Sequence, residues 1–330
     1  MNRTLALALF MGLSSVLAGG ACAGTASPEV HLLFAGDVLL DAGPGKVVEE
    51  GGNVFSDFAV LLKEADLAIA NLECPVATTG TAVDKIYTFR AHPRVVPVLA
   101  RHFGAVSVAN NHAVDYGREA FAETLGYLEK AGLPYFGGGR NLAQAHAPLI
   151  LERKGLRIAL LAFNGFKPRT FEALPDAPGV AWADEADILA DIHAVRSRHQ
   201  ADIIIPFLHW GWERDPEPTA QQRELAHKMI DAGADIVVGN HPHVTQEAEY
   251  YRDHLIVYSL GNFVFDGFFT EDTRTGWLLR LTIGRDGLLR WDAVAAQQDE
   301  KGLPHPIPGA FTPCGTAETR KIDFCRNGKL

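Results

Sequence analysis

Short apolar segments rich in Val, Ile, Leu and Ala recur along the chain and alternate with longer amphipathic segments. Short, continuously apolar runs are typical of buried strands, and apolar positions three or four residues apart are typical of helices that pack on a sheet. We expect strands at residues 30–34, 66–69, 105–108, 157–162, 202–208, 235–238 and 254–258, and helices at residues 119–131, 184–198 and 219–232. This alternation predicts an α/β fold.

The C-terminal part of the pattern differs. Residues 275–283 and 288–296 lie on either side of Gly284-Arg285-Asp286-Gly287, a sequence typical of a hairpin turn, so the sheet is expected to be mixed. We assign residues 24–300 to one domain and residues 301–330 to an extended, proline-rich tail. Cys314 and Cys325 lie in this tail, and in an oxidising compartment they are expected to form a disulfide.

The first 23 residues have the features of a secretory signal peptide. Arg3 precedes an apolar run, and Ala21-Cys22-Ala23 matches a cleavage site with small residues. Cleavage after Ala23 would deliver the protein to the periplasm or the medium. Two alternatives are an uncleaved anchor, for which the run is short, and a lipid at Cys22, which lacks the usual large aliphatic residue three positions upstream.

Composition narrows the class of protein. The chain has 330 residues, of which 47% are hydrophobic and 21% are charged, which excludes a disordered or collagen-like protein. Its formal net charge of −10 argues against a nucleic-acid partner, because such binding needs a basic surface that displaces counterions from phosphates. An anionic substrate would therefore need a local source of positive charge.

Polar side chains follow the ends of the expected strands. Since ligands of open α/β sheets collect beyond the carboxyl ends of strands, we expect these side chains to converge. Carboxylates, amides and imidazoles together favour a divalent ion such as Zn, Mn or Fe. The residues in question are Asp37, Asn71, Glu73, Asn111, His112, Asp115, His209, His241, His243 and Asn262.

Several of these residues also have a purely structural interpretation. His241 and His243 would point to the same side of an extended segment, but one of them could cap a loop instead. His209 could be a hydrogen-bonded core histidine, and Asp37 could form an Asx turn. Either Asn71 or Glu73 could face the metal.

Two further assignments concern residues around the expected metal site. Asp115 could orient a neighbouring imidazole or belong to the turn before the next helix. Arg90 is the cation best suited to hold an anionic substrate, with a solvated surface residue as the alternative.

Six motifs, in order over about residues 30 to 270, resemble the CapA family of poly-γ-glutamate capsule proteins. That family is similar to the calcineurin-like metallophosphoesterases, so the resemblance implies a sandwich of two mixed β-sheets flanked by helices. The motifs are Gly36-Asp37, Asn71-Leu72-Glu73, Asn111-His112-Ala113-Val114-Asp115-Tyr116-Gly117, His209-Trp210-Gly211-Trp212-Glu213, His241-Pro242-His243-Val244-Thr245-Gln246 and Ser259-Leu260-Gly261-Asn262-Phe263-Val264-Phe265-Asp266.

The resemblance implies two divalent ions and gives the polar residues their roles. His112 would protonate the leaving group with Asp115 beside it, and Asn71, Arg90 and Asn262 would contact the substrate. The implied metal ligands are Asp37, Glu73, Asn111, His209, His241 and His243.

The chain also departs from the related motifs. Leu39 stands where the phosphoesterases carry a first-motif histidine, and Asn71-Leu72-Glu73 replaces a Gly-Asp phrase. Asp41-Ala42 replaces the Gly-Arg that usually continues the first motif of the CapA family.

The expected activity is metal-assisted hydrolysis or acyl transfer on an anionic polymer such as poly-γ-glutamate, or on a phosphoester. The alternative is a non-catalytic accessory protein that binds the polymer or partners a membrane capsule synthase.

Overall fold

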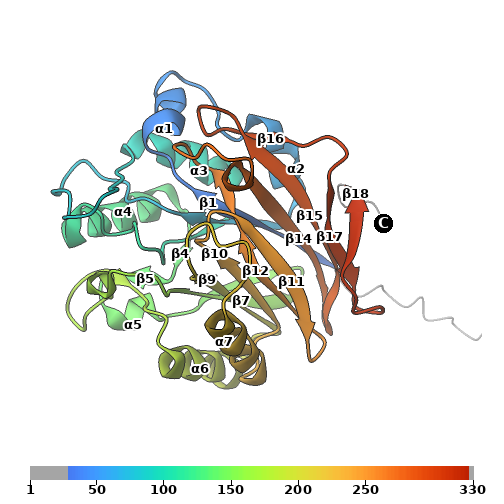
Figure 1. Ribbon diagram of the computed structural model, residues 1–330. Coiled ribbons are helices and arrows are strands. Elements are labelled where there is room, and N and C mark those ends of the chain that lie inside the picture. The colour runs from blue at the N-terminus through green and yellow to red at the C-terminus, as the bar shows by residue number, and fades with distance from the viewer. Residues whose placement is uncertain (1–28, 327–330) are drawn as a thin grey trace, which may run out of the picture.

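Two β-sheets pack face to face, and helices cover the outer face of each (Figure 1). The structure is a computed structural model and describes residues 29–326. The leader expected at residues 1–23 lies outside these residues. The architecture confirms the expected sandwich of two mixed sheets.

The first sheet has ten strands, with the path β18-β17-β15-β14-β1-β2-β3-β4. Strands β1 to β4 are parallel, and β14, β15, β17 and β18 continue the sheet in antiparallel fashion. Two short strands lie off this path, β13 beside β1 and β16 beside β15. The bounds are β1 Val30–Val38, β2 Leu67–Leu72, β3 Ala105–Ser107, β4 Tyr135–Phe136, β13 Asn262–Val264, β14 Thr275–Gly284, β15 Gly287–Gln298, β16 Pro304–Pro306, β17 Phe311–Thr316 and β18 Asp323–Arg326.

The second sheet has six strands in the order β11-β12-β10-β9-β7-β6. Its four central strands are parallel, and its two edge strands, β6 and β11, are antiparallel to their neighbours. A separate pair of short strands, β5 and β8, lies apart from both sheets. The bounds are β5 Gly138–Gly139, β6 Leu149–Arg153, β7 Leu156–Asn164, β8 Gly179–Val180, β9 Ile203–His209, β10 Ile236–Asn240, β11 Thr245–Tyr251 and β12 His254–Leu260.

Large apolar side chains fill the space between the sheets. Phe34 of β1 and Phe207 of β9 meet edge to face with ring centroids 5.4 Å apart, and Leu160 and Val257 are fully buried beside them. Each such side chain stabilises the fold by about 1.5–3 kcal/mol through burial. This layer fixes the two sheets relative to each other and so aligns the ends of their strands.

Helices cover the outer faces of the sandwich. Helices α1 to α4 pack on the first sheet, and α6 and α7 pack on the second. The expected helix at 184–198 is α6 followed by a π-helical segment at Val195–His199. Within residues 29–326 no helix has the length and apolar content that crossing a membrane requires. The bounds are α1 Ala42–Glu49, α2 Ala59–Glu64, α3 Val96–His102, α4 Gly117–Ala131, α5 Leu142–Ala145, α6 Glu185–Ala194 and α7 Ala220–Asp231.

The C-terminal residues belong to the first sheet rather than to a separate extended tail. β16 pairs with β15, and β17 lies between β15 and β18. Pro304 and Pro306 lie in β16, a short strand off the main path of the sheet, and proline is tolerated at such edges. A disulfide joins Cys314 of β17 to Cys325 of β18.

Gly36 allows β1 to pass directly beside β13. A Cβ at position 36 would lie 1.9 Å from the carbonyl oxygen of Gly261, and the Asp37 amide donates a hydrogen bond to that same oxygen at 3.1 Å. The glycine therefore sets the position of the aspartate that follows it.

We predict that Gly36→Ala lowers the free energy of unfolding by about 2–3 kcal/mol, because the added methyl group must displace backbone. Urea denaturation measures this change. The control is Gly126→Ala in α4, where the nearest atom is 3.8 Å away; it should stabilise the protein by about 0.5–1 kcal/mol because alanine favours helix. Equal stabilities of the two variants would contradict the close approach of β1 and β13.

Candidate metal centre

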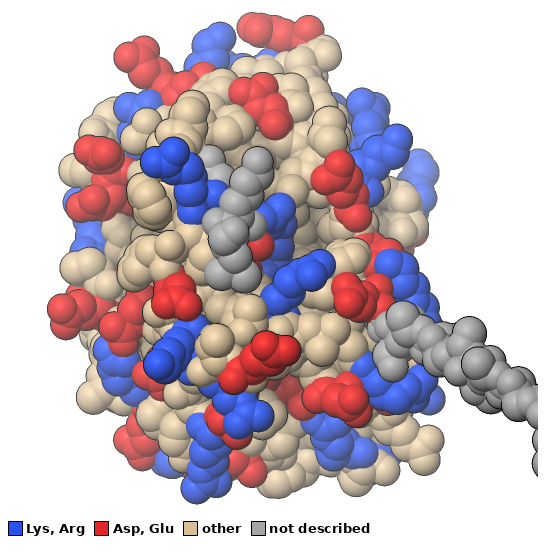
Figure 2. All heavy atoms as spheres, turned by 90° about the vertical axis from the view of Figure 1, so that its right-hand side faces the viewer, with Lys and Arg blue, Asp and Glu red and all other residues tan. Residues whose placement is uncertain are grey.

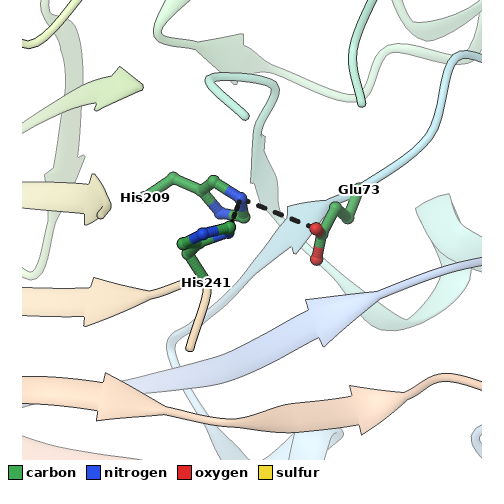
Figure 3. Close-up of side chains that lie close together, drawn as sticks. All are labelled: Glu73, His209 and His241. Atoms are coloured by element: carbon green, nitrogen blue, oxygen red, sulfur yellow. Dashed lines mark hydrogen bonds and ion pairs between the residues drawn. The ribbon is translucent and has the colours of Figure 1, made fainter. Parts of the chain in front are cut away.

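Charged and imidazole side chains from both sheets meet at the carboxyl ends of the parallel strands. Asp37 lies near the end of β1, Glu73 directly follows β2, and His209 ends β9. His241 and His243 follow β10. All five are buried, and Figure 3 shows His209 and His241 facing Glu73. The convergence expected from the strand ends is therefore present in the structure.

These five residues form two candidate ligand groups that share Glu73. Glu73, His209 and His241 make one group, and Asp37, Glu73 and His243 make the other. In each group the three ligand atoms lie within 4.8 Å of one another. A carboxylate common to two adjacent groups is the arrangement of a two-metal site with a bridging ligand.

The distances show how closely the acids and imidazoles approach. His209 Nε2 lies 3.5 Å and His243 Nε2 lies 3.8 Å from Glu73 Oε1. Asp37 Oδ1 is 3.9 Å from His209 Nδ1, and Asp37 Oδ2 is 3.7 Å from His243 Nδ1.

Several buried polar atoms of the cluster lack a hydrogen-bond partner within residues 29–326, and a cation could take the place of that partner. Both Glu73 carboxylate oxygens and His241 Nε2 are buried with no hydrogen-bond partner in the described part of the chain. His209 Nε2 lies 2.8 Å from Asn111 Oδ1 and 3.0 Å from His241 Nδ1, although one nitrogen can carry only one proton. Unpaired buried polar groups are costly, and a divalent ion would satisfy these nitrogens and oxygens together. The donor set thus fits Zn, Mn or Fe.

Burial shifts the pKa values of this cluster strongly. Burial raises the pKa of Asp37 to about 7, against the opposing effect of hydrogen bonds from Asn71 and the His241 amide. Burial, followed by the nearby charge of Asp37, raises the pKa of Glu73 well above its usual range. The pKa values of His209 and His241 are held well below their usual range by burial, which also lowers the pKa of His243 to about 4. The imidazoles are therefore neutral near pH 7, the form in which they bind metals.

The backbone of the His241-Pro242-His243 segment differs from the extended segment expected from sequence. His241 has φ +97° and His243 has φ +57°, in a region that non-glycine residues seldom adopt. The two rings consequently enter different ligand groups rather than lying on one side of a strand. The His241 amide donates to Asp37 Oδ2 at 3.2 Å, which helps to hold this conformation.

Asparagines orient the ligands. Asn71 Nδ2 donates to Asp37 Oδ1 at 2.8 Å, and Asn110 Nδ2 donates to Asn71 Oδ1 at 3.1 Å. Asn262 Oδ1 lies 2.8 Å from His243 Nδ1, and its Nδ2 donates to the Thr273 carbonyl. Asn71 and Asn262, which were expected to contact substrate, thus have positioning contacts here, and Glu73 is the residue common to both ligand groups.

His112 lies next to the ligands in the turn after β3 and is paired with Asp115. Its Nδ1 is 2.6 Å from Asp115 Oδ2, and burial lowers the pKa of this imidazole, against the opposing hydrogen bond to Asp115. Lys85 donates to Asp115 Oδ1 at 2.8 Å and to the Asn111 carbonyl at 2.7 Å. Asp115 therefore orients His112 and also ties down the loop that carries Lys85.

Arg90 does not reach this cluster. Its guanidinium donates to the carbonyls of Thr79 and Gly80 and stacks over the Tyr116 ring at 4.2 Å. Within residues 29–326 it makes no hydrogen bond or ion pair with a member of the cluster.

Several residues that pack on the site were not among those expected from the sequence. Lys85 lies on an irregular loop, and three phenylalanines cover three of the imidazoles. Asn164, the last residue of β7, holds the main chain of Phe166 through both ends of its amide. Asn164 could have been predicted as a site residue, since it comes just after the strand expected at residues 157–162. The loop residues do not follow an apolar run and could not be predicted in this way.

The sequence matches a known protein family over most of its length. Residues 31–267 match the family described as Bacterial capsule synthesis protein PGA_cap. The chain belongs to this family. The resemblance to CapA proteins is thereby confirmed.

Two curated relatives of this PGA_cap protein are named for capsule or polymer synthesis. It is 35% identical over 280 residues to the PGA biosynthesis protein CapA of Bacillus subtilis (strain 168), covering 83% of this chain and 73% of the relative. It is 31% identical over 292 residues to the Capsule biosynthesis protein CapA of Bacillus anthracis, covering 86% and 71% respectively.

Among solved structures, the 5'-nucleotidase precursor from Thermus thermophilus shares the fold of this PGA_cap protein. The TM-score is 0.50 at 14% identity, over 84% of this chain and 56% of the nucleotidase. The chain thus spans little more than half of the nucleotidase, and the likeness concerns the fold alone.

We predict that Mn²⁺ affinity falls as pH decreases from 8 to 6. Burial raises the pKa of the metal-free Asp37 carboxyl to about 7 and also raises the pKa of Glu73 well above its usual range, so below neutral pH a metal must displace protons, whereas the imidazoles are already neutral. Each displaced proton should raise the apparent Kd about tenfold per pH unit. Calorimetric titration of chelator-treated protein, in buffers with different ionisation enthalpies, measures both affinity and proton release. Affinity that is independent of pH would contradict these ligands.

Proposed function

We propose that this PGA_cap protein is a metal-dependent hydrolase or transferase of capsule metabolism that acts on poly-γ-glutamate or on a phosphoester. The observation that carries the proposal is the buried Glu73 carboxylate shared by two ligand groups, with His112 beside them. The names of the two CapA relatives support a role in capsule or polymer synthesis.

Bound divalent ions would polarise a substrate oxygen and lower the pKa of a water molecule. The first ligand group would hold one ion through Glu73, His209 and His241, and the second would hold another through Asp37, Glu73 and His243. Asn111 places its Oδ1 beside His209 and could complete the first group.

His112 would transfer the proton to the leaving group. Its Nδ1 is engaged with Asp115 Oδ2, which leaves Nε2 as the nitrogen that can exchange a proton with substrate. Phe89 packs on the His112 ring with centroids 4.6 Å apart and shields it from water on that side.

Local charge reconciles an acidic protein with an anionic substrate. The chain has a formal charge of −10, but distant charges are screened over about 8 Å, so the metal centre dominates the field that a substrate meets. On the face in Figure 2, Lys and Arg are interspersed with Asp and Glu. Arg280 lines a cleft on the first sheet, but it already pairs with Asp292 in the same cleft at 2.6 Å and so does not offer an anionic substrate a free positive charge.

The proposal also includes export. Residues 1–23 have the composition of a signal peptide, and the disulfide between Cys314 and Cys325 is typical of proteins outside the reducing cytoplasm.

We predict that His241→Ala and His112→Asn separate metal binding from turnover. His241→Ala should lose bound metal and activity together, since it removes a ligand. His112→Asn should keep its metal and lose about 10²- to 10⁴-fold in kcat, since it removes the proton donor. Elemental analysis is paired with hydrolysis of bis(p-nitrophenyl) phosphate and of poly-γ-glutamate.

A metal-loaded wild-type protein that binds poly-γ-glutamate but cleaves neither substrate would contradict the hydrolase proposal and favour the accessory role. Retention of both ions by His241→Ala would contradict the ligand assignment.

A further inference from the structure

Three phenylalanines from separate loops cover the imidazoles at the mouth of the metal centre. Phe89 packs on His112, with ring centroids 4.6 Å apart. Phe166 packs on His241 at 4.0 Å, and Phe268 packs on His243 at 4.8 Å. The loops that carry these rings therefore surround the centre.

The same loops expose apolar side chains next to the phenylalanines. Ile86 is 92% exposed and Tyr87 66%, just before Phe89. Trp212, 58% exposed, meets the Phe166 ring edge to face, and Phe269, next to Phe268, is 90% exposed. Exposed apolar groups gathered around a site are typical of a binding surface. We call Ile86, Tyr87, Trp212 and Phe269 the apolar rim.

Arg214 lies on the loop that carries Trp212 and is fixed beside the metal ligands. Its amide donates to the Pro242 carbonyl at 2.7 Å, between His241 and His243, and its φ is +64°. Its guanidinium lies 5.9 Å from the centre of the Phe268 ring.

Apart from the Phe268 ring, the Arg214 guanidinium is unpaired in the described part of the chain. Within residues 29–326 it makes no hydrogen bond and no ion pair, although Glu213 precedes it. Two other cations in the neighbouring loop, Lys85 and Arg90, are already engaged: Lys85 binds Asp115 and the Asn111 carbonyl, and Arg90 binds two carbonyls. Arg214 therefore has donors available for a ligand.

We propose that Arg214 determines specificity by binding a carboxylate of a γ-linked glutamyl chain whose scissile bond lies at the metal centre. This inference rests on the proposed function and names the substrate. A guanidinium binds a carboxylate through two parallel hydrogen bonds.

The apolar rim favours a chain over a compact phosphoester. Each γ-linked glutamyl unit carries a free carboxylate and two backbone methylenes, so an extended chain can contact the cation and the rim at once. A small phosphoester at the metal centre would leave the rim unused. Loss of Arg214 is thus expected to weaken binding of the polymer, which also contacts the rim, more than binding of a small phosphoester.

The test compares Arg214→Gln with Arg252→Gln. Arg252 serves as the control because it is also exposed, has φ +47° and lies 5.4 Å from the Tyr251 ring, but it lies in the turn between β11 and β12. Unlike Arg214 it pairs with an acid, Asp231 at 2.7 Å, in an exposed ion pair of small energetic value. The probes are a γ-linked glutamate decamer and bis(p-nitrophenyl) phosphate. Calorimetry gives the Kd of the decamer, and kinetics give kcat and KM separately.

Arg214→Gln should raise the Kd and KM for the decamer about 10- to 100-fold while kcat changes less than about twofold, since a charge-assisted contact is lost. Arg214→Lys should restore part of the affinity. KM for bis(p-nitrophenyl) phosphate should rise less than KM for the decamer, and Arg252→Gln should match wild type in every measurement.

Decamer affinity unchanged in Arg214→Gln, or no decamer binding by the metal-loaded wild type, would overturn the inference. If Arg214→Gln fails to fold, an uncharged γ-linked isoglutamine decamer, in which each α-carboxylate is an amide, should bind the wild type at least tenfold more weakly than the glutamate decamer, and equal binding would overturn the inference. Binding that depends on Arg214 without cleavage would instead leave this inference standing and refute the hydrolase proposal.

Discussion

Two buried carboxylates in contact with three neutral imidazoles are the constraint on which the rest of the site depends. Asp37 and Glu73 are fully buried, and burial raises the pKa of both. Within residues 29–326 neither forms an ion pair with Lys or Arg. Two acids in this setting must share protons or bind a cation, and the unpaired Glu73 oxygens favour a cation. A divalent ion would thus bind to the cluster more readily as the pH rises.

The fold provides this cluster by aligning strand ends from two sheets. The packed layer around Phe34 and Phe207 sets one sheet against the other, and Gly36 brings β1 directly beside β13. Asn71 and Asn262 then orient individual ligands. Loops that carry phenylalanines pack over the imidazoles. The ligand groups are therefore held by the sandwich, and the residues around them lie on loops.

The longer apolar strands and the polar residues after them could be predicted, because apolar runs and strand ends are local features of the sequence. Most of the short strands and the edge strands β6 and β11 could not, since they lack long apolar runs and form through pairing with their neighbours. The separation of His241 and His243 into two ligand groups could not be, since it depends on positive φ angles stabilised by a contact with Asp37. Arg90 was expected to bind an anionic substrate because of its residue type. In the structure Arg90 is bound to two carbonyls, and the cation beside His112 is Lys85. Loops placed by long-range contacts carry no periodic signal, which is also why Arg214 was not singled out.

The most direct test is anomalous X-ray diffraction from crystals grown with Mn²⁺. Two anomalous peaks are expected about 3.5–4 Å apart, with Glu73 between them. One peak should lie beside His209 and His241, and the other beside Asp37 and His243. Absence of anomalous density at this cluster in a Mn²⁺-saturated crystal, with the carboxyl groups of Asp37 and Glu73 sharing a proton instead, would contradict this ligand assignment.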